Sequence, residues 1–291
     1  MIRAAALAAA LAAGFGAGAA SGGAGLSIEV RARAIAPGEP LRVIVASPVP
    51  LEDLRGHFLG RPLSFVASPG GRARWWSWAL VPLDADPGPA VIEVSGRTEA
   101  GRPVAGARAV DVVARDFPRE EIRVAPRYVE PPAGVRERLQ RERSRLQRIY
   151  ARRTAPPGPL GPFVAPVPGE PTSVFGTRRF FNGKPRDPHP GLDLKAARGT
   201  PVRASGPGVV ALAGDLYYSG NTVIIDHGAG LFTIYAHLDR IEVREGEAVR
   251  AGQRIGASGA TGRVTGPHLH WGAKIGTEPF DPRALLDPVL F

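Results

Sequence analysis

The chain has 291 residues, a formal net charge of +10, 37 glycines, 30 prolines and no cysteine. A chain of this length is long for one domain and sufficient for two. The absence of cysteine excludes disulfide bonds and thiolate metal ligands, so a metal site in this chain must use nitrogen and oxygen donors. The positive charge favours a polyanionic partner.

The N-terminus has the ordered regions of an export signal. Met1-Ile2-Arg3 precedes an Ala/Leu-rich run to about Phe15, and small residues follow. This order predicts a secretory signal peptide over residues 1–22, cleaved between about Ala19 and Gly25, with a low-complexity tail as the alternative. The apolar run is short and interrupted by glycine, so we expect no transmembrane anchor. The mature protein is therefore expected in the periplasm, in the cell wall or outside the cell.

Residues 26–124 carry a β pattern. Apolar residues recur at every second position, as in Leu41–Val45 and Ile92–Val94, and Pro-Gly pairs separate the runs. Several short strands at this spacing predict an immunoglobulin-like β-sandwich, and the fold class of the whole chain is expected to be mostly β.

Three tryptophans, Trp75, Trp76 and Trp78, lie in one of these predicted strands. Neighbouring residues of a strand point to opposite faces, so the three rings cannot all enter one core. We expect at least one ring in the core, and we consider a domain interface or a ligand contact for Trp75 or Trp76.

The period then changes to that of a helix. Apolar residues at helical spacing predict a basic amphipathic helix over residues 133–153, where eight arginines stand against two glutamates. This surface is either a solvated helix face or a contact for an anionic cell-wall polymer or membrane surface, and we expect no nucleic-acid partner. Residues 154–171 are rich in proline and glycine and predict an extended linker. A second β domain is expected over residues 172–291.

Two short motifs in this last domain contain metal-binding residue types. They are His189-Pro-Gly-Leu-Asp193 and His268-Leu-His270, and His237 lies between them in the sequence. A catalytic zinc site needs three nitrogen or oxygen ligands and an open fourth position, and these motifs can supply it. Residues two apart on a strand share a face, so one histidine of the pair can bind the metal while the other reaches its water. Each motif is weak alone, and their combination carries the prediction.

The sequences around these motifs resemble the M23 family of zinc metallopeptidases, of the LytM and lysostaphin type. The matching stretches run in the family's order and cover nearly all of residues 172–291; among them are Val174-Phe-Gly-Thr-Arg-Arg, Gly199-Thr-Pro-Val, Tyr235-Ala-His-Leu and Thr261–Trp271. The resemblance implies an antiparallel β-sheet domain. It also implies that one zinc ion is held by His189, Asp193 and His270, with His237 and His268 as the catalytic residues.

The activity implied is that of a peptidoglycan endopeptidase, in which zinc activates a water for attack on a peptide bond. No histidine is followed by glutamate, so a histidine must serve as the base; whether this is His237 or His268 is open. His57 and His227 are expected to take no part. One alternative is a catalytically silent domain of the same fold that activates a separate cell-wall hydrolase. Another is a carrier module built around Lys195, which would leave the histidines unexplained.

Overall fold

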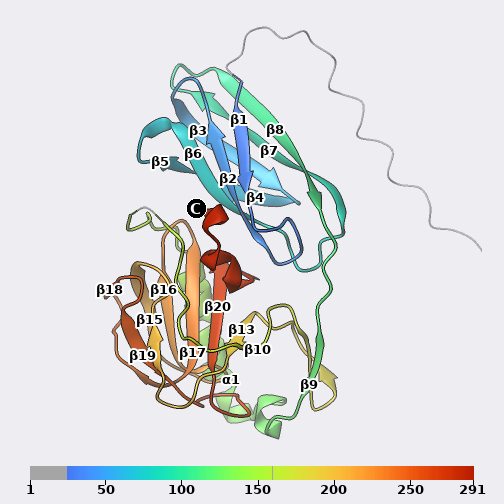
Figure 1. Cartoon of the computed structure of the whole chain (residues 1–291), viewed down its shortest axis with the longest axis vertical. Helices are drawn as coiled ribbons and strands as arrows, with labels where there is room; N and C mark the ends of the chain where they lie inside the picture. Colours follow the sequence, from blue (N-terminus) through green and yellow to red (C-terminus); the bar gives the residue numbers. More distant parts are fainter. Residues whose placement is uncertain (1–24, 159) are drawn as a thin grey trace, which may run out of the picture.

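The computed structural model describes residues 25–158 and 160–291, and the predicted signal peptide lies outside them. Within these residues the protein is mostly β, with one α-helix and several short 3₁₀ turns. Figure 1 shows two bodies stacked along the long axis, with the C-terminus at their junction. None of the helices in the described part is long and apolar enough to cross a membrane.

The N-terminal body contains two four-stranded antiparallel sheets that share one apolar core. Apolar residues at alternate positions of each strand enter this core, as the period of two predicts. The first sheet has the order β1 (Ser27–Arg31), β2 (Pro40–Ala46), β6 (Gly71–Leu80), β5 (Val66–Ser68), and the second has the order β4 (Arg61–Ser64), β3 (Leu51–Phe58), β7 (Gly88–Thr98), β8 (Pro103–Val112). The β prediction is confirmed here, and the immunoglobulin-like assignment stays a prediction.

The C-terminal body is built on one large, mainly antiparallel sheet. Its main path runs β10 (Pro171–Ser173), β13 (Gly191–Leu194), β20 (Leu269–Ile275), β17 (Leu231–Ile241), β16 (Gly220–Asp226), β15 (Gly208–Leu216), β18 (Ala248–Val249), joined by β14 (Pro201–Arg203), β19 (Arg254–Ser258) and β21 (Glu278–Phe280). The two motif strands β13 and β20 are neighbours in this sheet, which brings residues far apart in the sequence side by side.

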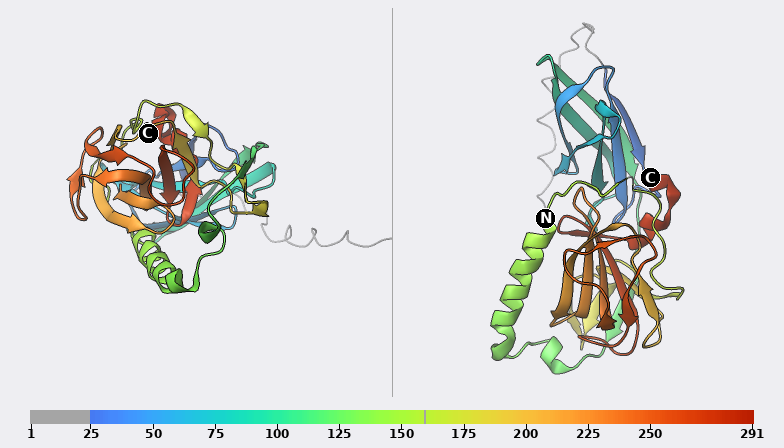
Figure 2. Two further views of the ribbon diagram at one scale, coloured as in Figure 1. Left: turned by 90° about the horizontal axis from the view of Figure 1, so that it is seen from below. Right: turned by 90° about the vertical axis from the view of Figure 1, so that its left-hand side faces the viewer.

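The predicted basic helix forms α1 (Arg136–Tyr150), preceded by the 3₁₀ turns η1 (Pro126–Tyr128) and η2 (Ala133–Val135). Its apolar stripe of Leu146, Ile149 and Tyr150 packs against the large sheet, and Figure 2 shows the helix along the side of the C-terminal body. The ring of Tyr150 meets that of Phe232 edge to face at 5.3 Å. Most of the arginines of α1 are exposed at the surface.

The proline-rich segment after α1 is extended, but it is not free of the domain. Leu160, Phe163 and Val167 are buried, and the ring of Phe163 stacks on that of the C-terminal Phe291 with centroids 5.7 Å apart. Two 3₁₀ turns, η3 (Pro282–Leu286) and η4 (Pro288–Leu290), end the chain at the same place. The segment therefore packs at the junction between the two bodies, and none of its described residues lines the groove described below.

An apolar cluster joins the two bodies. Trp76 and Trp78 of β6 are buried in it beside Phe280 and Leu285 of the C-terminal body, whereas Trp75 packs on the N-terminal core. Trp76 and Trp78 are two apart and share a face of the strand, and their rings meet edge to face at 5.6 Å. The interface that the sequence suggested for Trp75 or Trp76 thus belongs to Trp76, together with Trp78.

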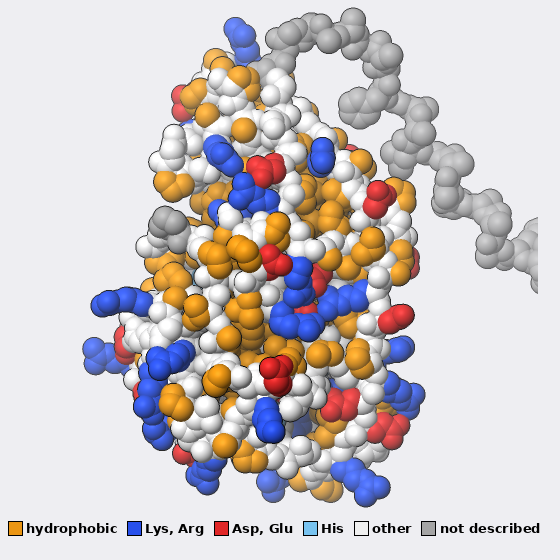
Figure 3. All heavy atoms as spheres, viewed as in Figure 1, with side chains coloured by type: hydrophobic (Ala, Val, Ile, Leu, Met, Phe, Trp, Pro, Cys, Tyr) orange, Lys and Arg blue, Asp and Glu red, His pale blue; other side chains and the backbone are white. Residues whose placement is uncertain are grey.

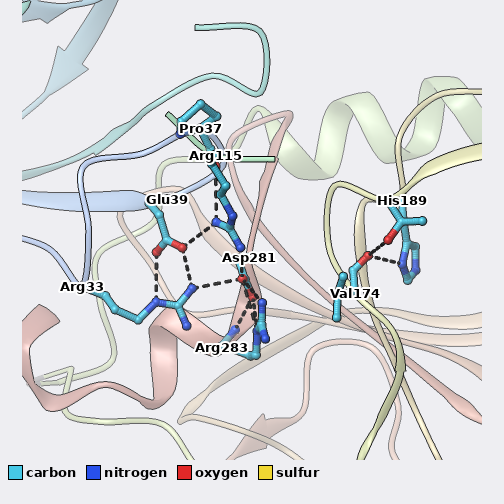
Figure 4. Close-up of polar contacts among 9 residues, drawn as sticks. Arg33, Pro37, Glu39, Arg115, Val174, His189, Asp281 and Arg283 are labelled. Carbon is cyan, nitrogen blue, oxygen red and sulfur yellow. Dashed lines mark hydrogen bonds and ion pairs between the residues drawn. The ribbon is translucent and has the colours of Figure 1, made fainter. Parts of the chain in front are cut away.

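An ion cluster also joins the two bodies (Figure 4). Arg33 and Glu39 come from the N-terminal body, Arg115 from the segment that follows β8, and Asp281 and Arg283 from the C-terminal body. Arg115 donates to Glu39 Oε1 at 2.7 Å and to Asp281 Oδ2 at 2.9 Å. Both carboxylates are buried, and a buried charge is costly without such partners.

The segment that connects the two bodies also contacts the C-terminal body. Strand β9 (Arg119–Ile122) pairs in parallel with β11 (Arg178–Phe181), which pairs with β12 (Lys184–Pro185) in a separate small sheet. Figure 1 shows β9 running down the side of the lower body. The connection thereby brings Glu120 next to Arg179, 59 residues further along the chain.

Candidate metal centre and active site

Three side chains converge at the end of β13 and β20. Asp193 and His270 are directly paired across these strands, so their side chains leave the sheet on the same face. His189 precedes β13 and is fully buried, with its Nδ1 atom 3.0 Å from the carbonyl of Val174, as drawn in Figure 4. That contact places the proton on Nδ1 and directs Nε2 at the other two residues.

The donor atoms have the spacing of a metal site. His189 Nε2 lies 3.1 Å from His270 Nδ1 and 3.1 Å from Asp193 Oδ1, and His270 Nδ1 lies 2.8 Å from Asp193 Oδ1. Ligands about 2.0–2.2 Å from a tetrahedral ion are separated by slightly more than 3 Å. The two nitrogen donors and the carboxylate oxygen therefore fit one small divalent cation.

Gly191 is required between the two ligands of the first motif. A Cβ atom at this position would lie 2.8 Å from both Cε1 and Nε2 of His270 and 2.6 Å from the carbonyl oxygen of Trp271. Only glycine allows β13 to approach the imidazole this closely.

The protonation states suit metal binding. Burial lowers the pKa of His189 to about 4, against the opposing effect of its contact with Asp193. Burial opposes ionisation of Asp193, but hydrogen bonds with His189 and His270 outweigh it and hold the pKa of the carboxyl below its usual range. At neutral pH the site presents a neutral His189 and a carboxylate, which are the forms that bind a metal.

His237 and His268 lie beside these ligands. The His237 ring is 4.9 Å from the His268 ring and 6.0 Å from the His270 ring, measured between centroids. His237 Nδ1 contacts the carbonyl of Thr261 at 2.9 Å, which leaves Nε2 free. Burial, followed by the neighbouring His270 and His268, lowers the pKa of His237 to about 3, so its imidazole is neutral at neutral pH.

The backbone at His237 is unusual. Its φ of 64° is in the left-handed region, and its N–H donates to the carbonyl of Ser219 at 2.8 Å in place of a regular ladder bond. Such a conformation costs about 1–3 kcal/mol and persists where the surroundings enforce it. Here it coincides with register shifts in the pairing of β17, and it places the imidazole at the ligand cluster.

The sequence motifs did not identify the residues that hold Asp193. Arg179 donates to Asp193 Oδ2 at 2.5 Å, to Ser173 Oγ at 3.0 Å and, from Nε, to Glu120 Oε2 at 3.3 Å. Ser173 also donates to Glu120 Oε2 at 3.0 Å. Arg179 lies in one of the stretches that carried the resemblance, whereas no local pattern marked Glu120.

These residues line one groove with a volume of about 440 Å³. Asp193, His237, His268 and His270 line the groove. Its other lining residues include four further parts of the chain: Glu120, Ile122 and Val124; Thr172, Ser173, Arg179 and Phe181; Tyr218 and Ser219; and Arg263–Pro267. The groove gives a peptide access to the ligand cluster, and the segment from the N-terminal body forms part of its wall.

The remaining two histidines do not line the groove. His57 is exposed in β3 of the N-terminal body. His227 is fully buried, with Nδ1 2.6 Å from the carbonyl of Pro207 and Nε2 2.7 Å from Thr233 Oγ1, so both of its ring nitrogens have structural partners.

A His–Asp–His set beside two more histidines in an open groove is an arrangement typical of metal-dependent hydrolases. Residues 187–282 match the model of Peptidase family M23. This domain therefore belongs to peptidase family M23, a family of peptide hydrolases, as its sequence resemblance implied.

Named relatives agree with this assignment. The chain is 54% identical over 101 residues to peptidoglycan DD-endopeptidase ShyA of Vibrio cholerae, a match covering 34% of this chain and 24% of that protein. It is 47% identical over 100 residues to DD-carboxypeptidase/endopeptidase Mpg of Neisseria meningitidis, covering 34% and 23%. The matched part is thus about a quarter of the length of these relatives.

One solved structure resembles both bodies together. A crystal structure from Pseudomonas aeruginosa, assigned to peptidase M23, is 29% identical and has a TM-score of 0.63, covering 88% of this chain and 96% of that one. The likeness therefore includes much of the N-terminal body as well as the family domain.

Proposed function

We propose that this protein is an exported zinc metalloendopeptidase that hydrolyses peptide bonds in the stems or cross-links of peptidoglycan. The observation that carries the proposal is the triangle of donor atoms of His189, Asp193 and His270, 2.8–3.1 Å apart, in a groove that also contains His237 and His268. All five positions that the chemistry needs are filled.

A zinc ion at this triangle would act as a Lewis acid on the peptide carbonyl and would lower the pKa of a water molecule. Hydrolysis forms a bond between the water oxygen and the carbonyl carbon, breaks the bond between that carbon and the amide nitrogen, and transfers a proton of the water to the departing nitrogen. His237 and His268 are placed to divide this work, one accepting the proton of water and the other stabilising the negative charge on the carbonyl oxygen. Carbonyl contacts at Nδ1 of both rings, from Thr261 and Gly266, leave their Nε2 atoms for these steps.

Three further features support a cell-wall substrate. The matched relatives carry names of peptidoglycan endopeptidases, and the N-terminal sequence has the pattern of an export signal. The exposed arginines of α1, among them Arg141 and Arg148, form a basic surface suited to an anionic wall polymer. Figure 3 shows Lys and Arg side chains projecting around the lower body.

We assign the N-terminal body, residues 26–124, to an immunoglobulin-like domain.

Two measurements test this function. The purified protein should contain about one zinc ion per chain and should release soluble muropeptides from isolated sacculi. His237→Ala should abolish release while the zinc content stays the same, whereas His57→Ala, a histidine exposed on the other body, should change neither. Zinc binding without cleavage of any wall type would instead support the silent domain that activates another hydrolase.

A further inference from the structure

Arg263 is a charged side chain in the groove that the hydrolytic chemistry does not use. Its guanidinium carbon lies 4.5 Å from the centre of the Phe181 ring and 4.8 Å from that of the Tyr218 ring. Across residues 25–158 and 160–291, this guanidinium has neither a carboxylate partner nor a hydrogen bond, and its backbone N–H donates to the carbonyl of Tyr218. The two rings thus hold the guanidinium through cation–π contacts, which use none of its N–H groups as hydrogen-bond donors to a carboxylate.

The surroundings of this guanidinium are short of negative charge. Burial lowers its pKa, and the nearby Arg179 and Arg186 lower it further, while Tyr218 acts in the opposite direction. Arg179 forms ion pairs with Asp193 and Glu120, and Arg186 donates a hydrogen bond to the carbonyl of Val129. Arginine nevertheless stays charged in proteins, so a half-buried guanidinium without a counter-charge is ready to bind an anion.

The position of Arg263 relates it directly to the reaction. It lies in the loop Thr261–Gly266, whose two ends contact the two histidines outside the ligand set: Thr261 through its carbonyl to His237, and Gly266 through its carbonyl to His268. The loop is also held from outside, because Tyr128 donates to the carbonyl of Gly262 at 2.9 Å. A group bound at Arg263 is therefore fixed relative to the histidines.

We propose that Arg263 binds a free carboxylate of the peptide substrate near the scissile bond and so determines specificity, an inference that rests on the proposed function. A guanidinium fork matches a carboxylate with two parallel hydrogen bonds, and the two acidic side chains that line the groove, Glu120 and Asp193, are paired with Arg179. The carboxylate can be the chain terminus of one strand of a cross-link or a side-chain carboxylate within the stem.

Kinetics with matched substrates test the proposal. A cross-linked peptide with all carboxylates free is compared with two versions, one amidated at its C-terminus and one at its side-chain carboxylate. The wild-type enzyme should show a KM about tenfold to a hundredfold higher for the version that lacks the recognised carboxylate, as expected for one charge-assisted pair. Equal KM values for all three substrates would overturn the proposal.

Three variants separate charge, shape and packing. Arg263→Met keeps the apolar contact with Phe181 and Tyr218, and it should show one common KM for all three substrates. Arg263→Lys keeps the charge without the fork and should recover only part of the preference. Arg250→Met, at an exposed arginine outside the groove, should retain the wild-type preference in full. A wild-type preference in Arg263→Met would contradict the proposal.

A binding measurement distinguishes this inference from the proposed function. Calorimetric titration measures the affinity of the protein for a non-hydrolysable peptide with its carboxylate free or amidated. The wild-type protein should bind the free peptide more tightly than the amidated one, and Arg263→Met should abolish this difference. This difference in affinity, found in a protein that hydrolyses no peptide, would support the carboxylate site and refute the proposed peptidase activity. Hydrolysis with equal binding of the free and amidated peptides would refute the carboxylate site alone.

Discussion

Arg179 donates a hydrogen bond from Nη2 to Oδ2 of Asp193 at 2.5 Å, while Oδ1 of the same carboxylate faces the two imidazoles. One oxygen is thus oriented by the protein and the other is left for a metal. Glu120 also contacts Arg179, through Nε at 3.3 Å, so the connection between the two bodies supports the orientation of Asp193.

Arg179→Gln should weaken metal binding. The substitution removes the charge that orients Asp193, and loss of such a partner lowers metal affinity by about tenfold to a hundredfold. Competition with a zinc chelator measures this affinity. Arg178→Gln, at the exposed neighbouring position, is the matched control and should bind metal as the wild type does. Equal affinities in the two variants would show that Asp193 does not depend on Arg179.

Gly191→Ala should displace His270. Its new Cβ would meet the imidazole at 2.8 Å and the backbone oxygen of Trp271 at 2.6 Å, so either β13 or the ligand must move. We expect loss of stoichiometric zinc and of activity, measured by metal analysis of the purified protein. Gly214→Ala, where no atom lies within 4 Å of the added carbon, should keep its zinc. A fully loaded Gly191→Ala protein would contradict the packing argument.

Trp78→Ala should loosen the junction between the two bodies. Trp78 is 5% exposed and contacts Trp76 and Phe291 with ring centroids 5.6 and 6.2 Å away. Removing a buried tryptophan costs about 3–5 kcal/mol in the free energy of unfolding, which denaturant titration measures. Val91→Ala, at an exposed position of β7, should cost much less. Limited proteolysis should also cut Trp78→Ala between the bodies before it cuts the wild type.

Acid should weaken the same junction through Asp281. Burial opposes its ionisation, but Arg283, Arg115 and Arg33 bring the folded-state pKa from 3.8 down to about 2. A depressed pKa means that the carboxylate stabilises the folded state above about pH 4 and loses this contribution as the pH falls toward 2. The difference corresponds to about 2 kcal/mol in the free energy of unfolding.

Denaturant titrations at pH 6, 4 and 2.5 measure this effect. Asp281→Asn should be less stable than the wild type at pH 6 and should lose less stability on acidification. Asp111→Asn, at an exposed carboxylate of β8, should follow the wild-type pH dependence. Parallel pH profiles for Asp281→Asn and the wild type would show that another group is responsible.

Local patterns were sufficient for the elements and for the ligand candidates. The period of two predicted the β character of both bodies, the helical period placed the helix within residues 133–153, and α1 occupies Arg136–Tyr150. The two motifs supplied the ligand candidates, the resemblance selected His189, Asp193 and His270 among them, and the fold brings these three together. These signals are local because the side-chain direction repeats with the backbone geometry of each element.

Long-range contacts were beyond such patterns. Glu120 meets Arg179 only because β9 pairs with β11, and Arg263 stands between Phe181 and Tyr218 only because three separate segments meet at the groove. The left-handed backbone of His237 likewise results from irregular pairing on both sides of β17. None of these features leaves a repeat in the sequence.

The sequence by itself determined the kind of site this protein has: the ligand types, the supply of histidines for proton transfer and the β scaffold that carries them. Only the tertiary structure decided how the ligands are held, which wall of the groove lacks a counter-charge and how the N-terminal body contributes to it. The physical reason is that donor chemistry belongs to single residues, whereas orientation, burial and electrostatic pairing depend on which distant segments the fold places in contact.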